Sequence, residues 1–414
     1  MPKVLQVVGL DVGTTRVRVV IAEVNGGNIE VVGVGTANSK GLRKGVVVNI
    51  DSAVESIKRA LEAAEQMSGT TVEQAYVGLG GAHIRSYNSK GVVAISRKNR
   101  EITVEDIRRV VDQASAVSVP SDREIVDVVP QEFTVDEQDG IGDPLGMLGM
   151  RLEVVVHIVT SPITAKQNIV TSVNRSGIIV IDTVLDPLAA AEAVLTEEER
   201  EYGTALIDIG GETTKLAIFH RGAIRHTAVF PLGGNHFTND IAVGLRTPIP
   251  AAERIKRQYG CTLSGLLSEN ERQSALEIPN VGGQSARSLS RYMLCEILQA
   301  RAEEIFAQVH QEIQRMGFDT QISSGVVLTG GGCLLSGMRE MAEQVLDLPA
   351  RLGGAPKGIG GLSDEIASPE YATALGLVVV GCKSRLGGVR SYLRTETSLR
   401  SRASRLREWI AGIF

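Results

Sequence analysis

Runs of β-branched apolar residues alternate along the chain with segments in which apolar residues recur at helical spacing. LQVVGLDV (5–12) and RVRVVIAEV (16–24) are predicted strands that a short Gly/Thr turn joins into a hairpin. GTALIDIGG (203–211) and TKLAIFHRG (214–222) repeat this strand–turn–strand pattern 197 residues later, with a slightly longer turn. A hairpin duplicated half a chain apart predicts two similar α/β lobes that face each other.

Helices are predicted between these strands. AVESIKRALEAAEQM (53–67) has helical apolar spacing, and Asp51 or Ser52 is its predicted N-cap. QAYVGLGG (74–81) is a further predicted strand that ends in glycines, and residues 288–316 are predicted to form one long helix. This alternation predicts a two-lobe fold of the α/β class.

Two segments do not fit the two-lobe pattern and are interpreted as insertions. Residues 83–162 combine the helix-like ITVEDIRRVVDQASAV with a Gly/Pro-rich loop and the strand EVVVHIVT, which predicts an α+β subdomain inserted in the first lobe. Residues 236–300 lack a strong strand pattern, and RLGGAPKGIGGL (351–362) has the composition of a surface loop. The expected organisation is a first-lobe core at 1–82 and 163–198, a second-lobe core at 199–235 and 301–367 with 236–300 inserted, a connecting helix at 368–382, a flexible linker at 383–402 and a terminal helix at 403–414.

The composition is that of an ordinary globular protein, with 43% hydrophobic and 22% charged residues, and 414 residues favour two or more domains. No segment approaches the ~18 consecutive apolar residues of a spanning helix. The N-terminus also lacks the pattern of a signal peptide. Four widely spaced cysteines without a CxxC motif predict reduced thiols, with neither disulfides nor a zinc site. These features favour a cytosolic location.

The net charge of −5 conceals an asymmetry along the chain. Residues 381–414 carry a net charge of +6, which leaves −11 on the first 380 residues. An acidic body with only 4% aromatic residues argues against a nucleic-acid partner. The basic tail is interpreted as a separate functional unit.

The two Gly-containing turns are the first candidates for chemistry. In a tight turn between strands, backbone N–H groups stay unpaired and point the same way, which suits phosphate oxygens. One such turn alone is also typical of a plain hairpin with a capping aspartate, but the duplication favours a phosphate site. The predicted residues are Asp11, Gly13, Thr14, Thr15, Asp208, Gly210, Gly211, Glu212 and Thr213, with Asp11 and Asp208 as Mg²⁺ ligands, Asp11 through water.

The third candidate is VVLTGGGCLLSGMREMAEQVL (326–346), in which a strand leads directly into three glycines and then a helix. Gly330, Gly331 and Gly332 allow the backbone to approach a flat base or its α-phosphate closely. A bulky residue at Gly330 is therefore expected to block the base. Glycine triplets also occur in ordinary loops.

Two phosphate hairpins followed by a Gly-Gly-Gly turn resemble the superfamily of actin, sugar kinases and heat-shock chaperone ATPases. LDPLAAAEAVL (185–195) and SPEYATALGLVVVG (368–381) are similar to its two connecting helices. In the chaperone branch a Glu-Pro dipeptide opens the first of these helices, and its carboxylate helps to position the attacking water. Asp186-Pro187 takes that place here. The resemblance implies a catalytic role for Asp186, and its shorter side chain puts fast hydrolysis in doubt.

AAERIKRQYG (251–260) is similar to a Glu-x-x-Lys-Arg helix that the chaperone branch places against ribose and adenine. The match implies that Glu253, Lys256 and Arg257 contact a nucleotide. A solvated, charged helical turn is the ordinary alternative for this spacing. The position of the segment between the second and third motifs favours the nucleotide.

The chain as a whole resembles the FtsA family of bacterial cell-division proteins, which are divergent actin homologues. PQEFTVD and GIGDPLGMLGMRLEVVVHIVT, both within residues 83–162, are more specific to this family than the nucleotide motifs. The resemblance implies binding of ATP with Mg²⁺, head-to-tail polymerisation with itself, and attachment to the cytoplasmic face of the cell membrane at the division site. It further implies that the FtsZ C-terminal tail docks on the 236–300 insert and that other division proteins are partners.

The C-terminal segment predicts an interfacial helix without reference to any family. In SRLREWIAGIF, five apolar residues at helical spacing span an arc of about 140°, with arginines on both flanks. This pattern is typical of a helix that lies on an anionic membrane surface. A helix docked on the body is the alternative, and the Ser/Arg-rich linker argues against it. The predicted membrane residues are Arg405, Leu406, Arg407, Trp409, Ile410, Ile413 and Phe414.

Other members of the superfamily provide the competing interpretations. A sugar or acid kinase needs a catalytic base beside a small-molecule cleft, and no motif marks one. A chaperone needs a peptide-binding domain after the ATPase, yet only 34 residues follow position 380. A cell-shape or pilus-assembly actin homologue is a closer alternative than a kinase or a chaperone. The 83–162 segment and the amphipathic tail distinguish this chain from those homologues.

Overall fold

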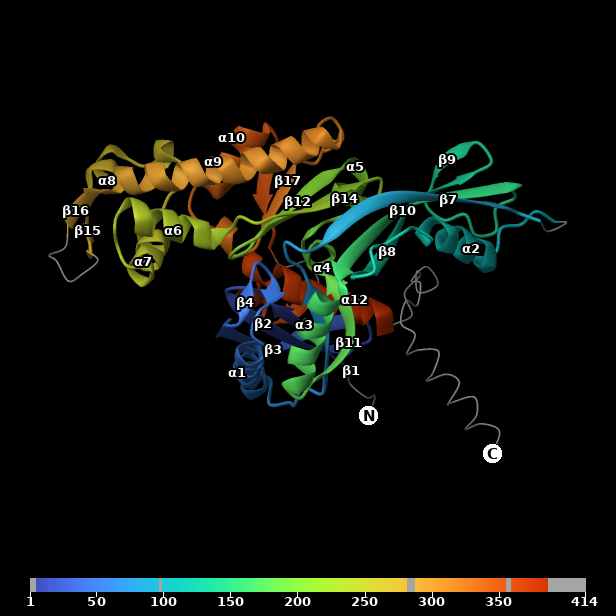
Figure 1. Ribbon diagram of the computed structural model, residues 1–414, viewed down its shortest axis with the longest axis horizontal. Coiled ribbons are helices and arrows are strands. Elements are labelled where there is room, and N and C mark those ends of the chain that lie inside the picture. The colour runs from blue at the N-terminus through green and yellow to red at the C-terminus, as the bar shows by residue number, and fades with distance from the viewer. Residues whose placement is uncertain (1–4, 97–98, 281–286, 355–358, 386–414) are drawn as a thin grey trace. The chain divides into compact units, whose positions relative to one another are not determined.

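The computed structural model describes residues 5–96, 99–280, 287–354 and 359–385 (Figure 1). The described residues form two compact units, one from residues 5–84 with 164–385 and the other from residues 85–163. All four cysteines are buried and free. None of the described helices is both long and apolar enough to cross a bilayer. The predicted membrane residues, 405–414, lie outside the described residues.

A six-stranded sheet forms the first half of the larger unit. Its strand order is β11-β6-β1-β2-β3-β19, in which β1, β2 and β3 are antiparallel and β6 and β11 run parallel to β1. The bounds are β1 Leu5–Val12, β2 Arg16–Asn25, β3 Asn28–Asn38, β6 Gln74–Leu79, β11 Ile179–Leu185 and β19 Ile359–Gly361, with the small ribbon β4 Leu42–Arg43 and β5 Val46–Val47 beside them.

Two helices cover one face of this sheet. α1 (Ile50–Ser68) and α3 (Ile163–Arg175) share one apolar core with the strands. The α1 N-cap is Asn49, whose side-chain oxygen accepts a hydrogen bond from the Ser52 amide at 2.9 Å, so the expected cap at Asp51 or Ser52 is wrong by two or three residues. The first predicted helix is otherwise confirmed.

A five-stranded sheet forms the second half of the larger unit and repeats the topology of the first. Its order is β14-β13-β12-β17-β18, again three antiparallel strands followed by two that run parallel to β12. The bounds are β12 Thr204–Ile209, β13 Thr214–His220, β14 Ala223–Phe230, β17 Val326–Thr329 and β18 Ala350–Leu352. The expectation of two similar lobes is therefore confirmed.

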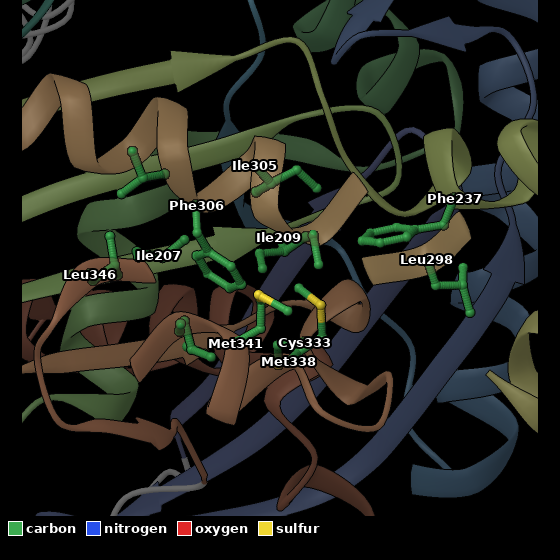
Figure 2. Packing of buried hydrophobic residues seen from close by; sticks show 14 of the residues in the cluster. Ile207, Ile209, Phe237, Leu298, Ile305, Phe306, Cys333, Met338, Met341 and Leu346 are labelled. Carbon is green, nitrogen blue, oxygen red and sulfur yellow. The ribbon is translucent and has the colours of Figure 1, made fainter. Parts of the chain in front are cut away.

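The largest apolar core lies between this sheet and the helices on one of its faces (Figure 2). Ile207 and Ile209 of β12 pack against Phe306 of α9 (Arg291–Arg315) and Met341 of α10 (Met338–Leu346). The expected helix at 288–316 begins three residues later, because β16 (Arg287–Ser290) pairs with β15 (Ala275–Ile278). Short strands therefore exist in the 236–300 insert, although its sequence lacks a strong strand pattern. α6 (Gly234–Gly244) begins two residues before the insert, which also contains α7 Ile249–Tyr259, η1 Ser264–Leu266 and α8 Glu269–Gln273.

Two helices connect the halves of the larger unit. α4 (Asp186–Val194) follows β11 of the six-stranded sheet and leads through α5 (Glu197–Tyr202) to β12 of the five-stranded sheet. α12 (Ala372–Arg385) packs against both α4 and β1. A Cβ atom at Gly376 would lie only 1.7 Å from the Ala189 carbonyl oxygen, so glycine is required where these helices meet. The stretch before α12 contains α11 Ser363–Ile366 and η3 Pro369–Tyr371. The segment 351–362, expected to be a surface loop, overlaps β18 at its start and β19 near its end.

The smaller unit is an α+β subdomain. Four antiparallel strands in the order β7-β10-β8-β9 have α2 (Val104–Ser115) packed on one face through Ile107, Val110 and Val111. The bounds are β7 Arg85–Ala94, β8 Arg123–Val135, β9 Gln138–Ile141 and β10 Arg151–Pro162. The helix expected near 102–117 is thus confirmed.

Candidate nucleotide site

The turn between β1 and β2 is held by its own backbone and by neighbouring loops. A Cβ atom at Gly13 would lie 2.7 Å from the Arg16 carbonyl oxygen, which explains the glycine. The Thr14 hydroxyl accepts a hydrogen bond from the Gly45 amide at 3.0 Å. The Thr15 hydroxyl is buried and has no hydrogen-bond partner among the described residues, so it is available to a polar ligand.

The turn between β12 and β13 has the same length as the first. Val12 pairs with Val17 and Ile209 pairs with Thr214, so four residues form each turn and the expectation of a longer second turn is wrong. The two turns touch, since a Cβ atom at Gly211 would lie 1.8 Å from the Thr15 hydroxyl oxygen. The duplicated hairpins therefore meet at one place.

Within the second turn, the backbone forms hydrogen bonds both inside the hairpin and with the start of α6. The Gly210 amide donates to the Thr213 carbonyl at 2.9 Å, and the Gly210 carbonyl accepts from the Gly234 amide at 2.8 Å. Glu212 points elsewhere, because its carboxylate accepts a hydrogen bond from the Lys44 amide at 2.6 Å. Among the predicted cofactor-binding residues, Glu212 alone does not line the cavity described below.

The three glycines after β17 have different structural roles. Gly330 has a φ of 80°, and a Cβ atom there would lie 2.3 Å from an Asp208 carboxylate oxygen. A Cβ atom at Gly332 would lie 2.4 Å from Ile209. At Gly331 the nearest atom, a Glu370 carboxylate oxygen, is 3.8 Å away. Packing therefore requires Gly330 and Gly332, and a side chain at Gly331 would enter the cavity. A bulky residue at Gly330, which is expected to block the base, would also clash with Asp208 and Ile209 of the fold itself.

Three of the four charged residues of α7 form a network at the other side of the cavity. The Glu253 carboxylate lies 2.7 Å from the Lys256 ammonium and 2.6 Å from the Arg257 guanidinium. Lys256 also donates to the Gly234 carbonyl at 3.0 Å. This network ties α7 to the start of α6 and so to the second hairpin.

All these elements line one cavity of about 670 Å³ in the larger unit. It contains residues that the sequence reasoning did not select, among them Arg18, Lys215, Asn235, Glu370 and Tyr371. The predicted residues that it brings together are Asp11, Gly13, Thr14, Thr15, Asp186, Asp208, Gly210, Gly211, Thr213, Glu253, Lys256, Arg257, Gly330, Gly331 and Gly332.

A cluster of buried charges forms one wall of the cavity. The Lys215 ammonium lies 2.9 Å from an Asp186 carboxylate oxygen and 2.9 Å from an Asp208 carboxylate oxygen. Arg18 pairs with Glu370, and its guanidinium lies over the Tyr371 ring. Each cation follows the aspartate of its hairpin by seven residues in the sequence. In the structure each cation is also the cross-strand partner of that aspartate. The repeated spacing could therefore have identified both cations from the sequence.

Negative charge exceeds positive charge in this cluster, and the pKa of Asp11 reflects the excess. Burial raises the pKa of Asp11 to about 7, the Asp186 carboxylate adds to the rise, and Arg18 opposes it. One oxygen of Asp186 has no hydrogen-bond partner among the described residues. Buried, undercompensated carboxylates of this kind suit a hard divalent cation. No group of three or more His, Cys, Asp or Glu side chains in the described ranges could hold a metal ion.

The duplicated sheets, their connecting helices and this cavity define an actin-like ATPase fold. A chain of a PilM–PilN type IV pilus biogenesis complex has a TM-score of 0.67 at 17% identity, covering 91% of this chain and 99% of that chain. MreB5 of Spiroplasma citri bound to ADP has a TM-score of 0.56 at 16% identity, covering 92% and 99%. These likenesses show the fold.

Sequence comparison defines the family within that fold. The family described as Cell division protein FtsA matches residues 205–376, and the SHS2 domain inserted in FtsA matches residues 81–160. The chain is 45% identical to the cell division protein FtsA of Pseudomonas aeruginosa, over 99% of this chain and 98% of that protein. It is 38% identical to FtsA of Escherichia coli K12, over 99% and 98%. The chain belongs to the FtsA family of cell-division proteins.

The raised pKa of Asp11 predicts a pH-dependent effect of the change Asp11→Asn. A carboxyl whose pKa is higher in the folded state than in the unfolded state destabilises the fold once the pH exceeds its unfolded value, here 3.8. Asparagine removes that cost. The gain in free energy of unfolding should be larger at pH 8 than at pH 5 by on the order of 1–3 kcal/mol, measured by denaturant unfolding without nucleotide.

Asp319→Asn is the matched control for this comparison, because Asp319 is exposed in a turn. Its effect should be small and equal at both pH values. An Asp11→Asn gain that is the same at pH 5 and pH 8 would show that Asp11 does not titrate in this range.

Proposed function

We propose that this cavity binds ATP with Mg²⁺. The observation that carries the proposal is the meeting of both hairpin turns and the Gly331 backbone on one cavity with an excess of buried carboxylates. The solved structures of MreB5 from Spiroplasma citri, which share the fold, are bound to ADP and to AMPPNP. Binding of a nucleotide by this chain accords with that shared fold.

The cavity residues have distinct proposed roles. The amides of the two turns and the free hydroxyl of Thr15 hold phosphate oxygens. Asp11 and Asp208 hold water molecules around Mg²⁺, which when bound neutralises phosphate charge. Gly331 lets the base or its α-phosphate lie against the backbone. Glu253, Lys256 and Arg257 line the ribose and adenine side.

The change Gly331→Val tests this assignment. The valine side chain would occupy space that is open in the structure, whereas the fold itself would not be disturbed. Loss of even one charge-assisted hydrogen bond costs about 1.5–3 kcal/mol, so ATP affinity should fall roughly tenfold to a hundredfold in titration calorimetry. Gly265→Val is the control, because no atom lies within 4 Å of a Cβ atom there and the residue is outside the cavity. Unchanged ATP affinity in Gly331→Val, with normal thermal unfolding, would contradict the proposed site.

We further propose that the nucleotide acts chiefly as a conformational and assembly cofactor. Asp186, the residue that the resemblance makes catalytic, has a short side chain that is already engaged by Lys215. The other oxygen of Asp186 has no hydrogen-bond partner among the described residues, but the shorter side chain of aspartate reaches less far toward an attacking water than glutamate would. ATP binding then favours one arrangement of the two lobes, which presents polymer contacts, and nucleotide release reverses the change.

Slow turnover is the expected outcome. Steady-state phosphate release at saturating ATP and Mg²⁺, with and without anionic vesicles, should be far below the ordinary enzyme value of about 10 s⁻¹. A kcat near that value under either condition would make the protein an efficient ATPase and would overturn the assembly role.

The cellular role that we propose is tethering of FtsZ filaments to the cytoplasmic face of the membrane at the division site. Membership of the FtsA family supports a role in the division machinery. The 236–300 insert is proposed to hold the FtsZ C-terminal tail, and exposed apolar residues such as Val243 and Ile249 are available there. The amphipathic pattern of residues 403–414 supports membrane attachment by the C-terminal segment.

Truncation after Ser401 tests the tether. Burial of large apolar side chains contributes roughly 1.5–3 kcal/mol each when complete, and each arginine near anionic lipid adds about 1 kcal/mol. One copy should bind reversibly, and a polymer should bind far more tightly through multivalency. The full chain with ATP should therefore sediment with anionic vesicles and carry FtsZ with it.

The truncated chain, and nearly to the same extent Trp409→Glu, should stay in the supernatant with unchanged ATP affinity. FtsZ lacking its C-terminal tail is the control for the FtsZ contact and should not sediment with either form. If the truncated chain still sediments with the vesicles, residues 402–414 are not the anchor.

A further inference from the structure

Lys215 is one of the cavity residues for which the motifs provide no role. It lies on β13 directly across from Asp208 of β12, and its ammonium is 2.9 Å from the Asp208 carboxylate. The same ammonium is 2.9 Å from Asp186, the first residue of α4. The three side chains are only 8–12% exposed, so water provides little screening.

The position of Lys215 joins the two halves of the larger unit. Asp186 follows β11 of the six-stranded sheet directly, whereas Asp208 and Lys215 belong to the five-stranded sheet. A Cβ atom at Gly80, which follows β6, would lie 3.1 Å from the Lys215 side chain and 2.0 Å from Asp186. Lys215 is thus enclosed between the sheets and cannot turn away without breaking both ion pairs.

The first hairpin has a cation at the equivalent position, but that cation is used differently. Arg18 lies across from Asp11 and forms its ion pair with Glu370. Lys215 therefore provides the only ammonium or guanidinium in the described part of the chain that is within 4.0 Å of the Asp186 and Asp208 carboxylates. A polyphosphate entering this cavity meets that pair of carboxylates.

We propose that Lys215 is a fixed internal counter-ion, a positioning residue that neutralises Asp186 and Asp208 and thereby sets how strongly nucleotide affinity depends on Mg²⁺. This inference rests on the proposed nucleotide site. With Lys215 in place, part of the repulsion between buried carboxylates and phosphate is removed by the protein itself. Without it, an added divalent cation must supply the compensation.

The test is a double-mutant cycle of Lys215→Met and Asp186→Asn. Methionine keeps most of the length of the lysine side chain and removes its charge, and asparagine removes the negative charge that is then uncompensated. Each protein is measured without nucleotide by thermal unfolding, and with a fluorescent ATP analogue in EDTA and in excess Mg²⁺.

Lys215→Met alone should unfold at a lower temperature than wild type, and Asp186→Asn with Lys215→Met should recover most of that loss. In EDTA, Lys215→Met should bind the analogue about tenfold or more weakly than wild type, because one partner of a buried charge pair is missing. In excess Mg²⁺ the difference should shrink, so the variant gains more affinity from Mg²⁺ than wild type does.

Two results would overturn the inference. An affinity loss that is equal in EDTA and in Mg²⁺, and that Asp186→Asn does not reduce, would mean that Lys215 contacts phosphate directly. No change in unfolding temperature or Mg²⁺ dependence would mean that Lys215 is not needed as a counter-ion. Failure of the wild type to bind nucleotide would instead refute the proposed site, while the unfolding temperatures of the cycle would still report on the ion pairs.

Discussion

The close packing of α4 against α12 is the constraint on which the cavity depends. Gly376 and Ala189 bring the two helices into backbone contact, which a larger residue at position 376 would prevent. Both helices begin at the cavity. α4 starts with Asp186, and the turn η3 before α12 places Pro369 where its carbonyl accepts a hydrogen bond from the Gly330 amide. A change in the crossing of these helices would therefore move a carboxylate and the glycine turn together.

The same packing explains why so many charges lie within one cavity. Two hairpins with the same register each place an aspartate opposite a cation, and the helix crossing adds Asp186 between them. Neither sheet alone contains an unusual cluster. The six-stranded sheet brings Asp11 and Asp186, and its cation Arg18 is paired with Glu370. The five-stranded sheet adds Asp208 and Lys215, whose charges balance, and Lys215 reaches Asp186 across the two sheets. The compensation of Asp186 by Lys215 is therefore coupled to the arrangement of the lobes.

Sequence reasoning could predict the elements whose signal is local. The duplicated hairpins, α1 and the glycine turn follow from strand patterns, helical spacing and backbone freedom, and all lie where they were expected. The short strands β15, β16, β18 and β19 could not be predicted, because three or four residues carry too little pattern and their pairing partners lie elsewhere in the chain. The cap at Asn49 was missed because Asn49, Asp51 and Ser52 are all good caps and lie close together in the sequence.

For the cavity, the sequence could predict which residue types are present but not which groups each of them contacts. Glu212 has the right chemistry and lies in the right turn, yet its carboxylate is used by the Lys44 amide. Lys215 lies outside the motif, and only the strand register shows that it faces Asp208. Glycines present the same limit, since the three residues of the Gly-Gly-Gly turn look alike in sequence and packing leaves only Gly331 open. The chemistry of this site is therefore set as much by what each group already contacts as by the groups themselves. Asp186 shows this most clearly, because the carboxylate that the family resemblance makes catalytic is also a partner of Lys215.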